Sequence, residues 1–165
     1  MRMGVNFFEN VEKKRIITMN IYVASKVSHA PQWREVRDMV SDSDITITSR
    51  WIDYEEHSDI VMNRKDELWQ QCLEDIAAAD AMIIYMRSGI RPSEAALVKS
   101  GYAIALGKPV VCINTRPQTF TDLDSKMDAE FTHHPLWMWV HCPTAYMAGF
   151  YEGFQKALKA LNVLG

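Results

Sequence analysis

The chain has 165 residues, a mass of 19.0 kDa and a net charge of −3 at neutral pH. Apolar residues make up 48% of it and charged residues 24%, which excludes a disordered chain, a collagen-like repeat and a coiled coil. The length fits a single domain. Proteins that bind nucleic acid without sequence preference normally carry an excess of basic residues, so the negative charge disfavours a nucleic-acid polymer as partner.

The N-terminal segment and the cysteines indicate where the protein works. Residues 1–18 have their charges in the middle and lack the apolar core of a signal peptide, so we expect a flexible arm there. No stretch reaches the roughly 18 apolar residues of a membrane span, and no membrane partner is expected. Three cysteines at positions 72, 112 and 142 form no C-x-x-C pair, which excludes a zinc ribbon. We expect a cytoplasmic protein whose domain covers residues 19–165.

From residue 19 onward, strands and helices are predicted to alternate. The strands are short apolar or β-branched runs, at residues 20–24, 45–48, 81–86, 110–114 and 137–141. The helices have apolar residues three and four apart, at residues 31–40, 61–79, 93–106 and 143–161. Gly107 has the position of the glycine that ends a helix. Residues 53–60 and 115–136 are expected to be loops.

This alternation predicts a single-domain α/β protein with a five-stranded parallel sheet and helices on both faces. The flavodoxin-like strand order 2-1-3-4-5 is the simplest arrangement. Ligands of such sheets bind beyond the carboxyl ends of the strands. The candidate ligand-binding residues therefore follow the strands, and they are Ser25, Lys26, Trp51, Asp53, Ser88 and Gly89.

Each candidate in the first half of the chain has a functional and a structural interpretation. Ser25 and Lys26 suit a sugar or phosphate oxygen, or form a simple turn. Trp51 suits stacking on a base through its ring face, or packs at the rim of the core. Asp53 suits a hydrogen bond from a sugar hydroxyl, or is only solvated.

The second half of the chain has fewer candidate ligand-binding residues. Ser88 and Gly89 are typical of a small anion-binding turn, although they match no P-loop. His133 and His134 are adjacent and have no third ligand nearby, so no metal site is predicted. No dinucleotide-binding, serine-hydrolase or Walker motif occurs, and no cofactor is expected.

Five fragments occur in an order that resembles the nucleoside 2-deoxyribosyltransferase-like family, which includes deoxynucleoside 5′-monophosphate N-glycosidases. They are IYVAS (21–25), TSRWID (48–53), LEDIAAADAMII (73–84), GYAIALGKPVVCIN (101–114) and FTHHP (131–135). The resemblance implies cleavage of the bond between a base and a deoxyribose. It implies a glutamate that attacks the anomeric carbon and an aspartate that helps to protonate the departing base.

Two positions depart from the family pattern. The family glutamate stands two residues before the glycine of the G-Y-A run, where this chain has Lys99. The position before the Leu-Glu-Asp-Ile run is often acidic, and here it is Cys72, which we interpret as a core residue. Glu94, in the first turn of the same helix, is the substitute catalytic carboxylate or merely a solvated one. Lys99 is a phosphate or carboxylate contact, or a surface residue.

Two functions follow from this pattern. One is N-glycosidic bond cleavage or deoxyribosyl transfer with an atypical active site, and the alternative is a non-catalytic nucleotide-binding module. Both take a small-molecule nucleoside or nucleotide. We also expect a homo-oligomer, specifically a dimer, because the 115–136 loop and the C-terminal helix add apolar surface. The stripe on that helix, interpreted as core or dimer surface, consists of Tyr146, Phe150, Phe154, Leu158 and Leu161.

Overall fold

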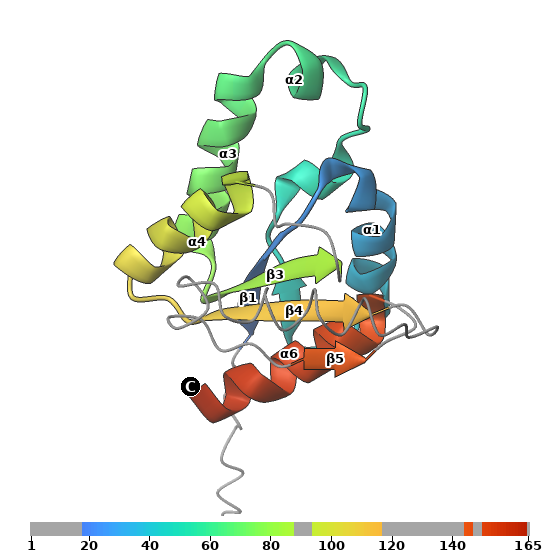
Figure 1. Cartoon of the computed structure of the whole chain (residues 1–165), viewed down its shortest axis with the longest axis vertical. Helices are drawn as coiled ribbons and strands as arrows, with labels where there is room; N and C mark the ends of the chain where they lie inside the picture. Colours follow the sequence, from blue (N-terminus) through green and yellow to red (C-terminus); the bar gives the residue numbers. More distant parts are fainter. Residues whose placement is uncertain (1–17, 88–93, 117–143, 147–149, 165) are drawn as a thin grey trace, which may run out of the picture.

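The computed structural model describes residues 18–87, 94–116, 144–146 and 150–164 (Figure 1). Strands are β1 (Met19–Ala24), β2 (Ile45–Ile47), β3 (Ala81–Arg87), β4 (Val110–Arg116) and β5 (Thr144–Tyr146). Helices are α1 (Ala30–Met39), α2 (Asp59–Met62), α3 (Lys65–Ala78), α4 (Glu94–Ala105) and α6 (Phe150–Leu164). Two short 3-10 helices, η1 (Val27–His29) and η2 (Arg50–Asp53), follow β1 and β2.

The strands form a parallel sheet in the order β2-β1-β3-β4-β5. The α/β class, the parallel pairing and the order of β1 to β4 are confirmed. The strand expected at residues 137–141 lies outside the described residues. The structure instead pairs Thr144 of β5 with Asn114 of β4, at a place where the sequence predicted the start of the last helix. That prediction is wrong, because α6 begins at Phe150.

The centre of the sheet forms the core. Ile21 pairs with Ala81 and Val23 with Ile83, and the side chains of Ile21, Val23 and Ile83 are fully buried. Continuous β-branched runs suit such strands because both faces of the sheet are covered. Figure 1 shows α3 and α4 on one side of the sheet and α1 and α6 on the other, and each pair is in contact.

The apolar stripe of the C-terminal helix belongs to this core. Phe154 is fully buried, and its ring lies edge-on to Trp33 of α1 at 6.1 Å between centroids. Leu161 is also buried, and Leu158 packs against the same cluster. Of the two interpretations of this stripe, core packing is therefore confirmed for Phe154, Leu158 and Leu161.

The long helix predicted at residues 61–79 is two helices. α2 ends at Met62 and α3 begins at Lys65. Arg64, with φ −118° and ψ 51°, lies outside the helical region and breaks the run. The apolar spacing that predicted the helix continues only from Leu68, so the prediction extended it too far toward the N-terminus.

The end of α4 follows the sequence signal. Gly107 has φ 72°, where a residue with a side chain is strained. Its N–H donates to the carbonyl of Ile104 at 2.9 Å, and the N–H of Lys108 donates to the carbonyl of Ala103 at 3.0 Å. This pair of bonds is the Schellman motif, and the predicted terminal glycine is confirmed. In the segments that the structure describes, no helix is long and apolar enough to cross a bilayer.

Candidate functional site

The polar side chains nearest to the predicted site follow β1. Ser25 is half-buried, and its hydroxyl accepts a hydrogen bond from the indole N–H of Trp33 at 2.8 Å. Lys26 is exposed and precedes η1. Because the strands are parallel, these residues lie at the same edge as the carboxyl ends of β2 and β3. The hydroxyl donates only a long hydrogen bond, of 3.5 Å, to the carbonyl of Lys26, so Ser25 remains a candidate for a ligand oxygen.

Trp51 lies in the core and not at the rim. Its side chain is only 4% exposed, and its indole N–H donates to the carbonyl of Val23 at 2.8 Å. The buried hydroxyl of Ser49 accepts from the N–H of Val23 at 2.8 Å and donates to its carbonyl at 3.2 Å. The side chains of Ser49 and Trp51 thus supply hydrogen bonds to the backbone of β1 beyond the end of β2. Because stacking on a base needs an open ring face, the proposed site does not include Trp51.

The remaining candidates near the sheet edge differ in what the structure shows. Asp53 is exposed and pairs with Arg37 of α1 at 2.8 Å, and this contact raises the pKa of the Arg37 guanidinium. Ser88 and Gly89 lie outside the described residues. Glu94 is exposed and is the first residue of α4. Its carboxylate therefore stands at the end of the helix where the exposed N–H groups favour an anion.

Lys99 does not extend into solvent with its neighbours. Its ammonium lies 5.5 Å from the ring centroid of Trp69 on α3 and 5.9 Å from that of Tyr22 on β1. The residue is half-buried, and no carboxylate pairs with it in the part of the chain that the structure describes. Aromatic faces stabilise a cation but leave its N–H groups available to an acceptor. Lys99 can therefore still bind an anionic group.

A buried polar cluster lies beneath Lys99, and the sequence did not reveal it. The Tyr22 hydroxyl is fully buried and makes no hydrogen bond of normal geometry to a described residue. The thiol of Cys72 and the carboxylate of Asp75 are the ionisable groups that act on it. Burial raises the pKa of the Tyr22 phenol well above its usual value, and Cys72 and Asp75 raise it further. The phenol therefore stays neutral at ordinary pH.

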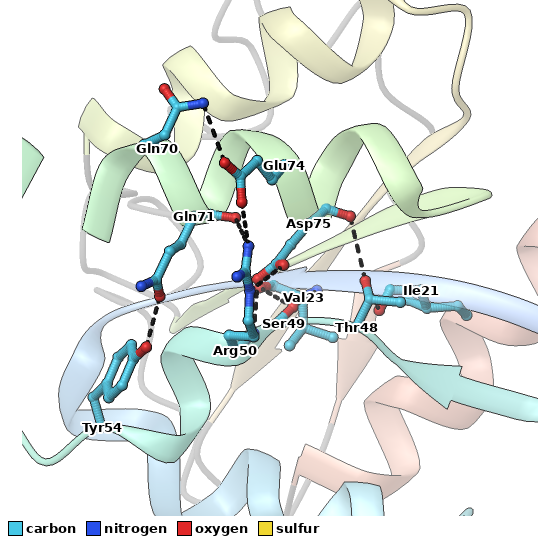
Figure 2. Close-up of polar contacts among 10 residues, drawn as sticks. All are labelled: Ile21, Val23, Thr48, Ser49, Arg50, Tyr54, Gln70, Gln71, Glu74 and Asp75. Carbon is cyan, nitrogen blue, oxygen red and sulfur yellow. Dashed lines mark hydrogen bonds and ion pairs between the residues drawn. The ribbon is translucent and has the colours of Figure 1, made fainter. Parts of the chain in front are cut away.

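A second polar network ties the end of β2 to α3 (Figure 2). The carboxylate of Asp75 is buried and accepts from the backbone N–H of Arg50 at 2.8 Å and from its Nε at 2.7 Å. Arg50 also pairs with Glu74 at 2.8 Å and donates to the carbonyl of Gln71 at 3.2 Å. These contacts raise the pKa of the Arg50 guanidinium and lower the pKa of the Glu74 carboxyl.

This network explains two of the five fragments on which the resemblance rests. Arg50 stands in TSRWID and Asp75 in LEDIAAADAMII, and the structure joins them directly. The presence of both residues in these fragments was the only sequence feature that pointed to them, and the sequence does not show that they pair. Each of the two carboxylate oxygens of Asp75 accepts a hydrogen bond from Arg50, so we interpret the network as structural.

The described residues contain no group of three or more His, Cys, Asp or Glu side chains arranged for a metal ion. His133 and His134 lie outside the described residues, so the prediction that they bind no metal stays a prediction.

Comparison with known proteins finds similarity among solved structures. No family model matches the chain, and no curated protein is similar enough to count as a relative. Among solved structures, the chain resembles the CMP N-glycosidase BcmB of Clostridium botulinum at 10% identity, with a TM-score of 0.46. The match covers 86% of this chain and 97% of that one. A similarity at this level assigns no function to the chain.

Proposed function

We propose that this protein binds a nucleoside or nucleotide beyond the carboxyl ends of its strands and cleaves the N-glycosidic bond, with Glu94 as the catalytic carboxylate. The supporting observation is the position of Glu94, which is exposed at the start of α4. Lys99, five positions later and about 140° around the helix, is directed toward Trp69 and Tyr22. The ammonium therefore does not neutralise the carboxylate from within the same helix. The resemblance of the sequence fragments supports the same reaction.

The proposed reaction needs one carboxylate and one water molecule. An oxygen of Glu94 attacks the anomeric carbon, and the carbon–nitrogen bond breaks with its electron pair passing to the base. The water supplies a proton to the base and a hydroxyl to the anomeric carbon, which releases Glu94 and the free sugar. If a second base replaces the water, the same intermediate gives deoxyribosyl transfer.

We propose a separate task for Lys99, Ser25 and Lys26. Their ammonium and hydroxyl groups suit the phosphate or the sugar oxygens of the ligand. Lys99 carries most weight in this set because it is half-buried and has no carboxylate partner among the described residues. A phosphate on the ligand would then be held on the side of α4 that faces α3.

The half-buried ammonium of Lys99 also favours a second candidate, a nucleotide-binding module without catalysis. An ammonium repels the positive charge that develops on the sugar ring during cleavage. If Lys99 reaches the sugar and not the phosphate, binding remains and chemistry is lost. The two candidates differ in whether base is released.

The first prediction tests Glu94. The Glu94→Gln variant should release base from deoxynucleosides or their 5′-monophosphates at least about 10³-fold more slowly than the wild type, because the amide cannot attack or stabilise charge. The matched control is Glu67→Gln, which removes an exposed carboxylate from the first turn of α3 and should leave the rate unchanged. Chromatography of the free base over a substrate panel provides the measurement.

Three outcomes separate the candidates. If both Glu variants cleave as fast as the wild type, the assignment of Glu94 is wrong. If the wild type releases no base but binds a nucleotide, and Lys99→Ala weakens that binding, the protein is a binding module. If it neither cleaves nor binds any member of the panel, both candidates fail.

A further inference from the structure

Trp69 is an aromatic residue near the expected ligand edge of the sheet, and no pattern in the sequence pointed to it. It lies in the first half of α3, and Lys99 lies in the first half of α4. Both helices run against the parallel strands, because α3 leads into β3 and α4 connects β3 to β4. The first halves of both helices therefore lie toward the carboxyl ends of the strands, where ligands of such sheets bind.

The burial of Trp69 differs from that of the stripe to which it belongs. Cys72 and Ile76, three and seven positions later on the same side of α3, are 2% and 0% exposed. Trp69 is only half-buried. The apolar stripe of α3 thus leaves the core at Trp69, and part of the indole is accessible to solvent.

This half-buried ring holds a cation. The Lys99 ammonium lies 5.5 Å from the ring centroid of Trp69 and 5.9 Å from that of the fully buried Tyr22. The two helices that carry Lys99 and Trp69 contact each other on one side of the sheet (Figure 1). A lysine side chain normally loses rotamer freedom when it binds an anion, and this loss weakens binding. Rings that already hold the ammonium reduce the loss.

We propose that Trp69 is a positioning residue that holds the Lys99 ammonium for a phosphate group of the ligand, so that the site selects nucleoside phosphates over neutral nucleosides. This inference rests on the proposed function, which brings a nucleoside or nucleotide to this edge of the sheet. Among the described residues no carboxylate pairs with Lys99, so its charge is left for the ligand. A phosphate gains a charge-assisted hydrogen bond from it, whereas a nucleoside offers only neutral acceptors.

The second prediction is measured by titration calorimetry of the whole chain with deoxynucleosides and with their 3′- and 5′-monophosphates. The wild type should bind one of the two monophosphates at least about 10-fold more tightly than the nucleoside. Lys99→Met should abolish this preference. Trp69→Leu should reduce it at least about 3-fold, because the ammonium is no longer held in place, while the affinity for the nucleoside stays the same. Trp69→Phe keeps a ring and should retain most of the preference.

The matched control is Leu68→Ala, which shortens the half-buried neighbour of Trp69 that packs against the core. It removes no ring, so it should leave the ratio of the two affinities unchanged even where it lowers stability. In the Lys99→Met background, Trp69→Leu should have no further effect on that ratio, because Trp69 acts through the ammonium.

Two results overturn the inference. One is a wild type that binds no monophosphate, or binds monophosphates no more tightly than nucleosides. The other is a Trp69→Leu variant that keeps the wild-type preference. Base release from the same panel tests the proposed function separately. Cleavage without a preference for phosphates leaves the proposed function standing and removes this inference, and a preference without cleavage does the reverse.

Discussion

At Lys99, a position where the sequence pattern leads one to expect a carboxylate, the structure places a cation between two aromatic faces. The distances of 5.5 and 5.9 Å to the rings of Trp69 and Tyr22 are within the range of cation–π contacts. The substitution is therefore accommodated by its surroundings, because the rings that would repel a carboxylate stabilise an ammonium. This single residue changes what α4 can contribute to a ligand site.

The third prediction measures that contact by urea denaturation. Lys99→Met keeps the apolar stem but removes the charge, and it should lower the free energy of unfolding by about 0.5–2 kcal/mol. In the Trp69→Leu background, the same change should cost less, because one of the two rings is already absent. Equal costs in both backgrounds would show that the Trp69 contact contributes nothing. Lys65→Met, at an exposed position on α3, is the control.

The fourth prediction concerns Tyr22 at alkaline pH. Its pKa is raised in the folded protein, chiefly by burial, so the native state keeps its proton where the unfolded chain loses it. The stability that this provides is complete below the unfolded pKa of about 10 and is lost as the pH rises beyond it. Tyr22→Phe removes this dependence.

Urea titrations of the wild type and Tyr22→Phe between pH 7 and 11 provide the test. The wild type should lose more stability than the variant above about pH 10. If the two curves remain parallel over the whole range, Tyr22 ionises as easily in the native protein as in the unfolded chain.

Among the elements, the connection between β2 and α3 depends most on polar contacts. Asp75 is buried, with a side chain only 8% exposed, while its partner Arg50 is 47% exposed. The carboxylate accepts both a backbone and a side-chain hydrogen bond from Arg50, and it thereby fixes the start of η2 against the helix. A charged pair with one buried member is costly to break because the other group cannot replace its contacts with water.

The fifth prediction follows from this geometry. Asp75→Asn should lower the free energy of unfolding by about 1.5–3 kcal/mol, because the amide retains one acceptor and places a donor against the Arg50 guanidinium. Glu74→Gln removes the exposed partner of the same arginine and should leave the urea midpoint unchanged. If the two variants are equally stable, the buried contact contributes no more than the exposed one.

The boundaries of the elements show which parts of the secondary structure local sequence patterns predict. The β-branched runs predicted β1, β3 and β4 to within two residues, and Gly107 marked the end of α4 because only a positive φ closes that turn. The break between α2 and α3 escaped prediction, since Asn63 and Arg64 are not helix breakers by type. Neighbouring structure, and not propensity, decides such a break.

At the scale of the whole molecule, the sheet brings together segments that are far apart in the chain. Ser25, Glu94 and the polar ends of the strands share one edge because each helix returns the chain to the same end of the sheet.

The sequence alone determined the alternation of strands and helices, the parallel sheet, the order of its first four strands and most of the core. These follow from the period and length of apolar runs, which are local properties. Only the tertiary structure decided that Trp51 is buried, that Arg50 binds Asp75 and that Lys99 lies between Trp69 and Tyr22. A periodic pattern tells which face of an element is turned inward, but the partner on the opposite element depends on register and packing between distant segments.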